Sequence, residues 1–302
     1  MNKIAIVYHR IDFDGICSYA VIRDAIELNL SIAKQKFSIT PIPWNRGDAL
    51  PELVGFDTVF VADICFPVPV MKKINDNARL IWIDHHATSI KEMEEAGLGH
   101  IGGLRRIGVG ACELAWEQMN PGTVCPKTVE LLSAYDVWDK KRFDWEAETL
   151  PFQYGMRNRF GLDAEKFVNE FYSFDDEVIG TICEEGRAVV QYIRQGGRNG
   201  VRNYGFDIMV GSVMKGLAIL TDQGGSAPYE ESAVERGAEV IVTLNRIGDD
   251  RYKISCYCPS GKPTVHIGKY LKEFYGGGGH EGAGGAVINT MEFVRIITEK
   301  QL

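Results

Sequence analysis

The sequence predicts an α/β protein of two domains, an N-terminal domain built on a parallel sheet and a smaller C-terminal α/β domain with a mixed sheet. Three observations lead to this fold class. Short apolar runs alternate with helix-like segments near the N-terminus, a long stretch of helical patterns follows, and strand patterns return after a glycine-rich break. A chain of 302 residues is long enough for each domain to bury its own core.

Three N-terminal segments have the composition of strands that are buried on both faces. They are KIAIVYH at 3–9, TVFVAD at 58–63 and RLIWID at 79–84, each rich in β-branched or aromatic residues. Helix-like segments at 15–29 and 67–77 lie between them, the second with proline near its start. Strands that alternate with helices predict a parallel sheet.

The rest of the chain separates into a helical stretch and a second α/β unit. Helical patterns dominate from about 110 to 200, including a segment at 164–173, until GGRNGVRNYG at 196–205 interrupts them with four glycines. We therefore expect an N-terminal domain at 1–185, a linker at 186–203 and a C-terminal domain at 204–302. In the last of these we expect strands at 206–213, 216–222, 238–246, 251–258 and 286–289, helices at 227–237 and 265–275, and a glycine-rich loop at 276–285.

The composition excludes several classes of function. A formal net charge of −8 argues against non-specific binding of duplex DNA, which needs a cationic surface. No apolar run approaches the roughly 20 residues of a membrane span, and charged residues occur too early for a signal-peptide core. The seven cysteines form no CxxC pair, so we expect reduced thiols and a cytoplasmic location.

Potential metal ligands stand where the three predicted N-terminal strands end. His9, Asp63 and Asp84 occupy these positions, and parallel sheets bind ligands at the carboxyl ends of their strands. Asp12 and Asp14 follow the first strand, and alternate residues of an extended turn share a face. The third strand continues into His85 and His86, and Asp136 is a further candidate in the helical stretch.

This ligand set fits two divalent ions better than one. Carboxylates and imidazoles without cysteine suit manganese, and magnesium, iron or zinc to a lesser degree. The number of aspartates is too large for one tetrahedral zinc but suits two ions that share a carboxylate, for which Asp63 is the candidate bridge. Side chains of adjacent residues diverge, so one of His85 and His86 would bind metal while the other faces substrate.

Structural interpretations of the same residues stay open. Asp12 or Asp14 could cap a helix instead of binding metal. Asp139 competes with Asp136, because it lies three positions further along. We interpret His100 and His266 as structural or surface groups. The segment GGGGHEGAGG, which begins at Gly276, could be a flexible linker, but its bare backbone could also approach a phosphate, with His280 as an extra donor.

These motifs together resemble the DHH phosphoesterases. Asp84-His85-His86 matches the motif that names the family, HRIDFDG resembles its first motif, and Asp63 and the YDVW around Asp136 resemble its second and fourth. GGGGHEGAGG resembles the signature of the DHH-associated C-terminal domain. Chain length and the fourth motif are most similar to the nanoRNases, which degrade short oligoribonucleotides or linear dinucleotides.

The resemblance implies a role for each motif residue, in a site that lies in the cleft between the two domains. One Mn²⁺ ion (or Mg²⁺) would be held by His9, Asp12 and Asp63, and a second by Asp14, Asp63, His85 and Asp136. His86 would contact the phosphate and Asp84 would orient the site. The C-terminal domain would bind the nucleotide through Gly277, Gly278, Gly279 and His280. Its strand KISCYC lacks an arginine found in many relatives, so Tyr257 is a candidate for base stacking instead.

The predicted activity is hydrolysis of short oligonucleotides or linear dinucleotides to mononucleotides, with water activated by two metal ions. A cyclic dinucleotide phosphodiesterase and a nucleoside-phosphate phosphatase share this chemistry and stay open. A nucleotide sensor that binds without cleaving is the alternative outside the enzymes, although every expected ligand position is filled. Neither a membrane nor stable duplex DNA is an expected partner, and a homodimer is expected only because relatives often form one.

Overall fold

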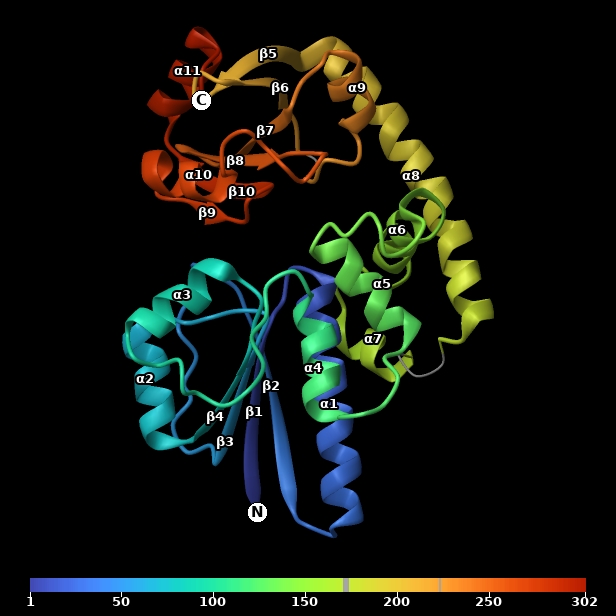
Figure 1. Ribbon diagram of the computed structural model, residues 1–302, viewed down its shortest axis with the longest axis vertical. Coiled ribbons are helices and arrows are strands. Elements are labelled where there is room, and N and C mark those ends of the chain that lie inside the picture. Colours follow the sequence, from blue (N-terminus) through green and yellow to red (C-terminus); the bar gives the residue numbers. More distant parts are fainter. Residues whose placement is uncertain (171–173, 223) are drawn as a thin grey trace. The chain divides into compact units, whose positions relative to one another are not determined.

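A four-stranded sheet with helices on both faces forms the first part of the protein (Figure 1). The computed structural model describes residues 1–170, 174–222 and 224–302. It divides into two compact units, Met1–Val189 and Val190–Leu302. The elements of the first unit are β1 (Asn2–His9), α1 (Phe13–Ile32), β2 (Phe37–Trp44), β3 (Thr58–Ala62), α2 (Val68–Asn77), β4 (Arg79–Ile83), α3 (Ala87–Glu95), α4 (Ala111–Met119), α5 (Lys127–Asp136), the π-helix η1 (Trp145–Thr149), α6 (Leu150–Phe160), α7 (Ala164–Glu170) and the first part of α8 (Asp176–Tyr204).

The first sheet is parallel throughout, which confirms the predicted fold class of this unit. Its strands lie in the order β2-β1-β3-β4. The chain runs from β1 to β2 on one side and then returns to place β3 on the other side of β1. The strand order therefore reverses between β1 and β3, and the carboxyl ends of strands at such a reversal are where open α/β sheets bind ligands.

Strand β2 is the element of this sheet that the sequence patterns did not predict. It contains Pro41 and Pro43, which lack the N–H that a ladder needs, and its residues are mostly partly buried or exposed. Proline is tolerated in a strand at the edge of a sheet. β2 lies at this edge, paired on one side with β1.

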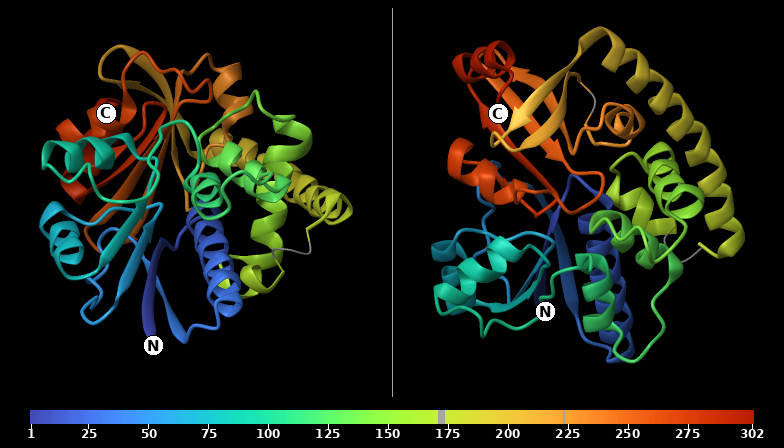
Figure 2. Two further views of the ribbon diagram at one scale, coloured as in Figure 1. Left: turned by 60° about the horizontal axis from the view of Figure 1, so that its bottom comes forward. Right: turned by 45° about the horizontal axis from the view of Figure 1, so that its top comes forward.

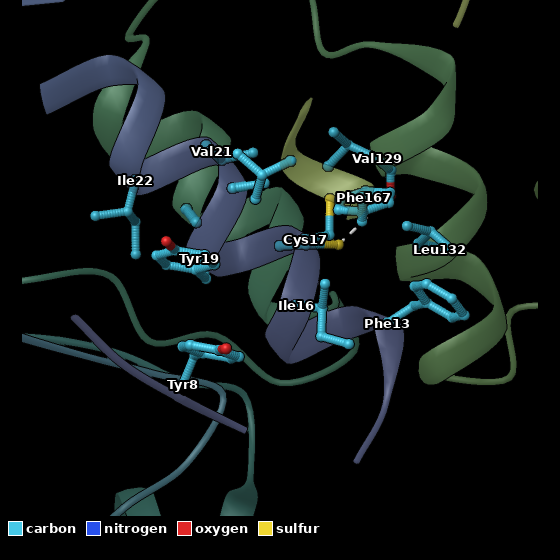
Figure 3. Packing of buried hydrophobic residues seen from close by; sticks show 14 of the residues in the cluster. Tyr8, Phe13, Ile16, Cys17, Tyr19, Val21, Ile22, Val129, Leu132 and Phe167 are labelled. Atoms are coloured by element: carbon cyan, nitrogen blue, oxygen red, sulfur yellow. Dashed lines mark hydrogen bonds between the residues drawn. The ribbon is translucent and has the colours of Figure 1, made fainter. Parts of the chain in front are cut away.

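Two cores fix the sheet between its helical layers. On one face, Tyr19 of α1 stacks on Tyr8 of β1 with ring centroids 4.6 Å apart, and Phe13 points toward Leu132 of α5 (Figure 3). On the other face, side chains of α2 and α3 pack against the strands around the buried Trp82. The helices on either side of β1–β4 can be followed in both views of Figure 2.

The second unit is a separate six-stranded mixed sheet, which confirms the prediction for the C-terminal part. Its strand order is β5-β6-β7-β8-β10-β9, with β6 and β7 parallel and the other neighbours antiparallel. One face packs against α10 and α11, and the other packs against α9 and the end of α8. The elements are β5 (Gly205–Val210), β6 (Met214–Leu220), α9 (Glu230–Glu235), β7 (Val240–Gly248), β8 (Arg251–Tyr257), α10 (Ile267–Tyr275), β9 (Gly278–Gly279), β10 (Ala283–Ile288) and α11 (Thr290–Glu299).

The glycine-rich stretch at 196–205 does not interrupt the helical pattern. Helix α8 continues through it to Tyr204, so the segment expected as a linker at 186–203 is helical. Gly197 has a packing reason to be glycine, because a Cβ there would overlap the backbone oxygen of Pro228. The glycine at position 197 is therefore explained by the close approach of α8 to the backbone of Pro228, and not by a break in the helix. The division of function between the expected domains stays a prediction.

The helix expected at 164–173 is present as α7 over Ala164–Glu170, and positions 171–173 of that expectation lie outside the described ranges. Among the helices in those ranges, none combines the length and the apolar character that crossing a membrane requires.

Candidate metal centre

The predicted ligands of the first unit converge on the reversal point of the parallel sheet. His9 is the last residue of β1, and Asp63 and Asp84 each follow directly after β3 and β4. Loops and helix ends bring in five further side chains. We call this set the metal centre: His9, Asp12, Asp14, Asp63, Asp84, His85, His86 and Asp136.

Asp63 has an unusual backbone conformation at the middle of this set. Its φ angle of 59° lies in the left-handed region, which is uncommon for a residue other than glycine. The conformation is held by a hydrogen bond from its N–H to the oxygen of Ile83, at 2.9 Å. Residues kept in sparsely populated conformations cluster at functional sites, and here the turn places the buried Asp63 carboxylate between two groups of ligands.

The first group consists of His9, Asp12 and Asp63. His9 Nδ1 lies 2.7 Å from Asp12 Oδ2 and 3.3 Å from Asp63 Oδ2. Burial alone would lower the pKa of His9, but its hydrogen bonds to the two carboxylates raise that pKa to about 11. Burial and the charge of Asp63 raise the pKa of Asp12. Asp12 also caps α1 by accepting from the N–H of Gly15 through Oδ1, so the helix-cap interpretation holds, while Oδ2 remains directed at His9.

The second group surrounds His85, which is buried. Its Nε2 lies 3.2 Å from Asp63 Oδ1, 3.2 Å from Asp136 Oδ2 and 3.6 Å from Asp14 Oδ2. Burial would lower the pKa of His85, but these carboxylates raise it to about 11. Burial, followed by the charges of Asp63 and Asp136, raises the pKa of Asp14. Burial raises the pKa of Asp136 to about 6 although the charge of His85 opposes the shift.

Asp84 and His86 form a pair next to Asp63, whose Oδ1 lies 3.9 Å from His86 Nδ1. Asp84 is fully buried, and its Oδ1 accepts from the backbone N–H groups of His85 and His86 at 2.7 and 3.1 Å. His86 Nδ1 lies 2.7 Å from the same oxygen. Burial would lower the pKa of His86, and the charge of Asp84 outweighs this effect and raises it. This contact orients the His86 ring: Nδ1 is directed at Asp84, and Nε2 lies on the side of the ring that faces away from Asp84.

Asp14 caps a helix that lies far from it in the sequence. Its two carboxylate oxygens accept from the N–H groups of Ala111 and Cys112, at 2.7 and 2.8 Å, in the first turn of α4. Gly110, directly before that helix, leaves the space for this contact, because a Cβ there would lie 2.8 Å from Asp14 Oδ1. The predicted helix-cap alternative is therefore present for Asp14, although the helix that it caps is not its own, and the ligand role stays a prediction.

Asn45 is another contact of the metal centre that sequence reasoning missed. Its Oδ1 lies 3.2 Å from His9 Nε2. Asn45 directly follows β2. Its position at a strand end could be recognised only if β2 were predicted, and the prolines of β2 prevent that prediction.

The competing candidates have other partners. The Asp139 carboxylate accepts from the N–H of Lys141, whereas Asp136 reaches His85. His100 Nδ1 lies 3.0 Å from the oxygen of Gly97, and His266 caps α10 by accepting from the N–H of Lys269. The structure therefore favours Asp136 over Asp139 and supports structural roles for both histidines.

The residues of the metal centre fit divalent cations. Ligand atoms of His9, Asp12 and Asp63 lie within 4.8 Å of one another, and so do those of Asp14, Asp63 and His85. In the described part of the chain, the ion pairs of these aspartates are all with histidine, with no lysine or arginine to neutralise them. Mutual repulsion among the carboxylates contributes to the raised pKa values of Asp12, Asp14 and Asp136, and a divalent ion would relieve it.

The glycine-rich segment of the second unit is a hairpin instead of an open loop. Strand β9 pairs with β10 through Gly278 and Gly285 and through Gly279 and Gly284. We call residues 277–285 the glycine hairpin. The N–H of Gly277 donates to Leu271 and that of His280 donates to Ala283, so these two N–H groups have partners within the unit.

The glycines of this hairpin differ in what surrounds them. A Cβ at Gly277 would overlap the backbone oxygen of Gly285, and one at Gly279 would overlap that of Ala283. Gly279 also has a φ angle of 140°, which side chains disfavour. A Cβ at Gly278 would meet no heavy atom within 4 Å. Packing therefore requires glycine at 277 and 279 but not at 278.

No protein-family model and no curated protein sequence matches this chain. Solved structures match over nearly its full length. An exopolyphosphatase-related protein from Bacteroides fragilis covers 99% of this chain and 91% of its own, with a TM-score of 0.56 and 12% identity. The DHH domain of a member of a ribosomal protein family covers 99% and 85%, with a TM-score of 0.52 and 17% identity. RecJ from Thermus thermophilus, in complex with Mg²⁺, covers 98% of this chain but 48% of its own, with a TM-score of 0.50 and 12% identity.

These matches define the class of fold: two α/β units, of which the first carries a parallel sheet. The fold of this chain is therefore the one that these solved structures share, among them a DHH domain, as the sequence motifs predict.

Proposed function

We propose that the protein is a metal-dependent phosphodiesterase that hydrolyses short oligonucleotides or linear dinucleotides to mononucleotides. The observation that carries this proposal is the pair of ligand groups that share Asp63 at the reversal point of the sheet. Two-metal sites of this kind are used for in-line displacement at phosphorus. A fold shared with a RecJ structure that contains Mg²⁺ supports a divalent ion, and the ligand chemistry favours Mn²⁺.

The proposed assignment gives each residue of the metal centre one task. His9, Asp12 and Asp63 hold one ion, and Asp14, Asp63, His85 and Asp136 hold the other. Bound ions supply an activated water and neutralise charge on the phosphoryl oxygens. His86, kept in place by Asp84, donates to a phosphate oxygen from Nε2. Gly277, Gly278, Gly279 and His280 contribute substrate contacts.

A substrate screen with purified protein tests the proposal. With Mn²⁺, linear dinucleotides and short RNA oligomers should yield mononucleotides, and a chelator should abolish the reaction while added Mn²⁺ restores it. Release of a linear product from a cyclic dinucleotide alone, or of phosphate from nucleoside phosphates alone, would favour those enzyme classes instead. Binding of nucleotide without any product would favour a sensor.

We also propose a cytoplasmic location. All seven cysteines are free thiols, and six of them are buried in the structure. A protein with this thiol content suits a reducing compartment.

A further inference from the structure

The indole N–H of Trp82 connects two parts of the metal centre that are separate in sequence. Trp82 is the penultimate residue of β4 and is 1% exposed. Its Nε1 lies 3.2 Å from the backbone oxygen of Ile64 and 3.2 Å from Asp84 Oδ2. Ile64 follows Asp63, so one shared donor reaches the turn after β3 and the carboxylate after β4.

Trp82 completes the hydrogen bonding of the Asp84 carboxylate. Oδ1 of Asp84 accepts from the His85 N–H and the His86 N–H and contacts His86 Nδ1. Oδ2 accepts from Trp82. The terminal torsion of an aspartate is broad, so donors to both oxygens are needed to fix its plane. A fixed Asp84 plane in turn fixes the ring of His86.

Trp82 also holds the strained turn at Asp63, through the residue that follows Asp63. The N–H of Asp63 donates to Ile83, and the oxygen of the next residue, Ile64, accepts from Trp82. The peptide group before the left-handed residue and the second peptide group after it are thereby tied to β4. Such a conformation costs about 1–3 kcal/mol and persists where the surroundings determine it.

The ring of Trp82 is itself fixed by the segment that follows α3. Its backbone N–H donates to Gly102 at 2.8 Å, and its backbone oxygen accepts from Arg105 Nη1 at 2.9 Å. The guanidinium of Arg105 lies 5.1 Å from the centre of the indole ring. The donor that reaches the metal centre therefore belongs to a side chain with little freedom to move.

We propose that Trp82 is a positioning residue that sets the Asp63 turn and the Asp84–His86 pair relative to each other. This inference rests on the proposed function, because it concerns the same ligands. Outer hydrogen-bond partners of metal ligands typically change metal affinity or activity by about 10- to 100-fold when they are replaced. Loss of the indole N–H alone should act at the lower end of this range.

Replacement of Trp82 by phenylalanine tests this role, with Trp44→Phe as the matched control. Trp44 is also buried in the same unit, and its indole N–H donates to the oxygen of Ala49 at 3.1 Å. Both variants lose one buried indole donor, so both should lose similar thermal stability in chelator. Trp82→Phe alone should weaken Mn²⁺ binding by about tenfold in calorimetric titration and lower kcat by a similar factor, with KM little changed.

A structural role alone gives a different result. If Trp82→Phe equals Trp44→Phe in Mn²⁺ affinity and in kcat, the proposal is overturned. If wild-type protein binds Mn²⁺ but cleaves no phosphoester, the proposed function fails while the titration still tests Trp82. Nitrogen-15 spectra of metal-free protein give an independent measurement: the Nδ1–H proton of His86 should exchange slowly in wild type and Trp44→Phe and rapidly in Trp82→Phe.

A variant with unchanged shape covers the case in which Trp82→Phe does not fold. Benzothienylalanine at position 82 keeps the bicyclic ring and replaces the N–H by sulfur. It should reproduce the loss of Mn²⁺ affinity. Wild-type affinity in this protein would overturn the proposal, because only the donor has been removed.

Discussion

The metal centre and the glycine hairpin are both dense in motif residues, but they use those residues in different ways. In the metal centre, side chains provide the candidate ligand atoms, and a strained turn at Asp63 and shared hydrogen bonds hold them in place. In the hairpin, the backbone determines which residues fit, and glycine at 277 and 279 is explained by packing against neighbouring peptides. A motif can therefore be rich in one residue type for reasons of fold as well as of ligand binding, and Gly278, which has no packing reason, is the position that distinguishes the two.

The largest expected effect comes from Asp63. Asp63→Asn keeps a residue type that tolerates the left-handed conformation, so the fold should survive. Loss of the shared ligand should lower hydrolysis with Mn²⁺ at least about 1,000-fold, since metal ions supply several kcal/mol of transition-state stabilisation. Steady-state kinetics measure the loss. Asp139→Asn is the control and should keep wild-type rates, and substantial activity in Asp63→Asn would refute the assignment of Asp63.

Two alanine substitutions in the hairpin separate packing from ligand contact. Gly277→Ala should cost about 1–3 kcal/mol in the free energy of unfolding, because its Cβ would overlap Gly285. Gly278→Ala should leave stability unchanged and raise KM about tenfold, a loss of roughly 1.4 kcal/mol in binding. Chemical denaturation and kinetics give the two values. A wild-type KM for Gly278→Ala would mean that the hairpin glycines serve the fold alone.

Gly110 tests whether a packing glycine can also matter in the metal centre. Gly110→Ala places a Cβ 2.8 Å from Asp14 Oδ1 and from the Cα of Ser133, so it should displace the Asp14 carboxylate. We expect a loss of about 1–3 kcal/mol in stability and about tenfold weaker Mn²⁺ binding.

The matched control for this substitution is Gly180→Ala. Gly180 lies on an exposed part of α8 in the same unit, and a Cβ there would meet no heavy atom within 4 Å. The substitution should therefore stabilise the protein by about 0.5–1 kcal/mol. Equal Mn²⁺ affinity in both variants would show that Asp14 does not depend on Gly110.

The smallest expected effect concerns Asp24, an acid of α1 outside the metal centre. Burial, with the charge of Glu27, raises its pKa to about 6. The folded state then binds more protons than the unfolded state between about pH 4 and 6, so stability falls as pH rises through this window. Asp24→Asn removes the effect and should gain about 1 kcal/mol at pH 7, a figure reduced for partial exposure, and nothing at pH 3. Thermal unfolding at the two pH values measures the difference, and an equal gain at both would contradict it.

The sequence predicts those parts of the fold and site that depend on local patterns. Strands buried on both faces are continuous apolar runs, so β1, β3 and β4 and the candidate ligands at their ends could be predicted. β2 could not, because its prolines are compatible with a strand only at an edge, and edges are not visible in a sequence. The helix continues to Tyr204 through a glycine-rich stretch in which Gly197 packs against the distant backbone of Pro228. Likewise, the contacts of Asp14 with Ala111 and of Trp82 with Ile64 join positions that no local pattern links.

The position of Asp14 has a consequence for protein engineering. Its carboxylate holds the first turn of α4 and at the same time faces His85. A designer who transplants only the strand ends and their aspartates onto another sheet would leave this carboxylate free to rotate. The smallest portable version of the site must therefore include the beginning of a helix that starts almost a hundred residues downstream.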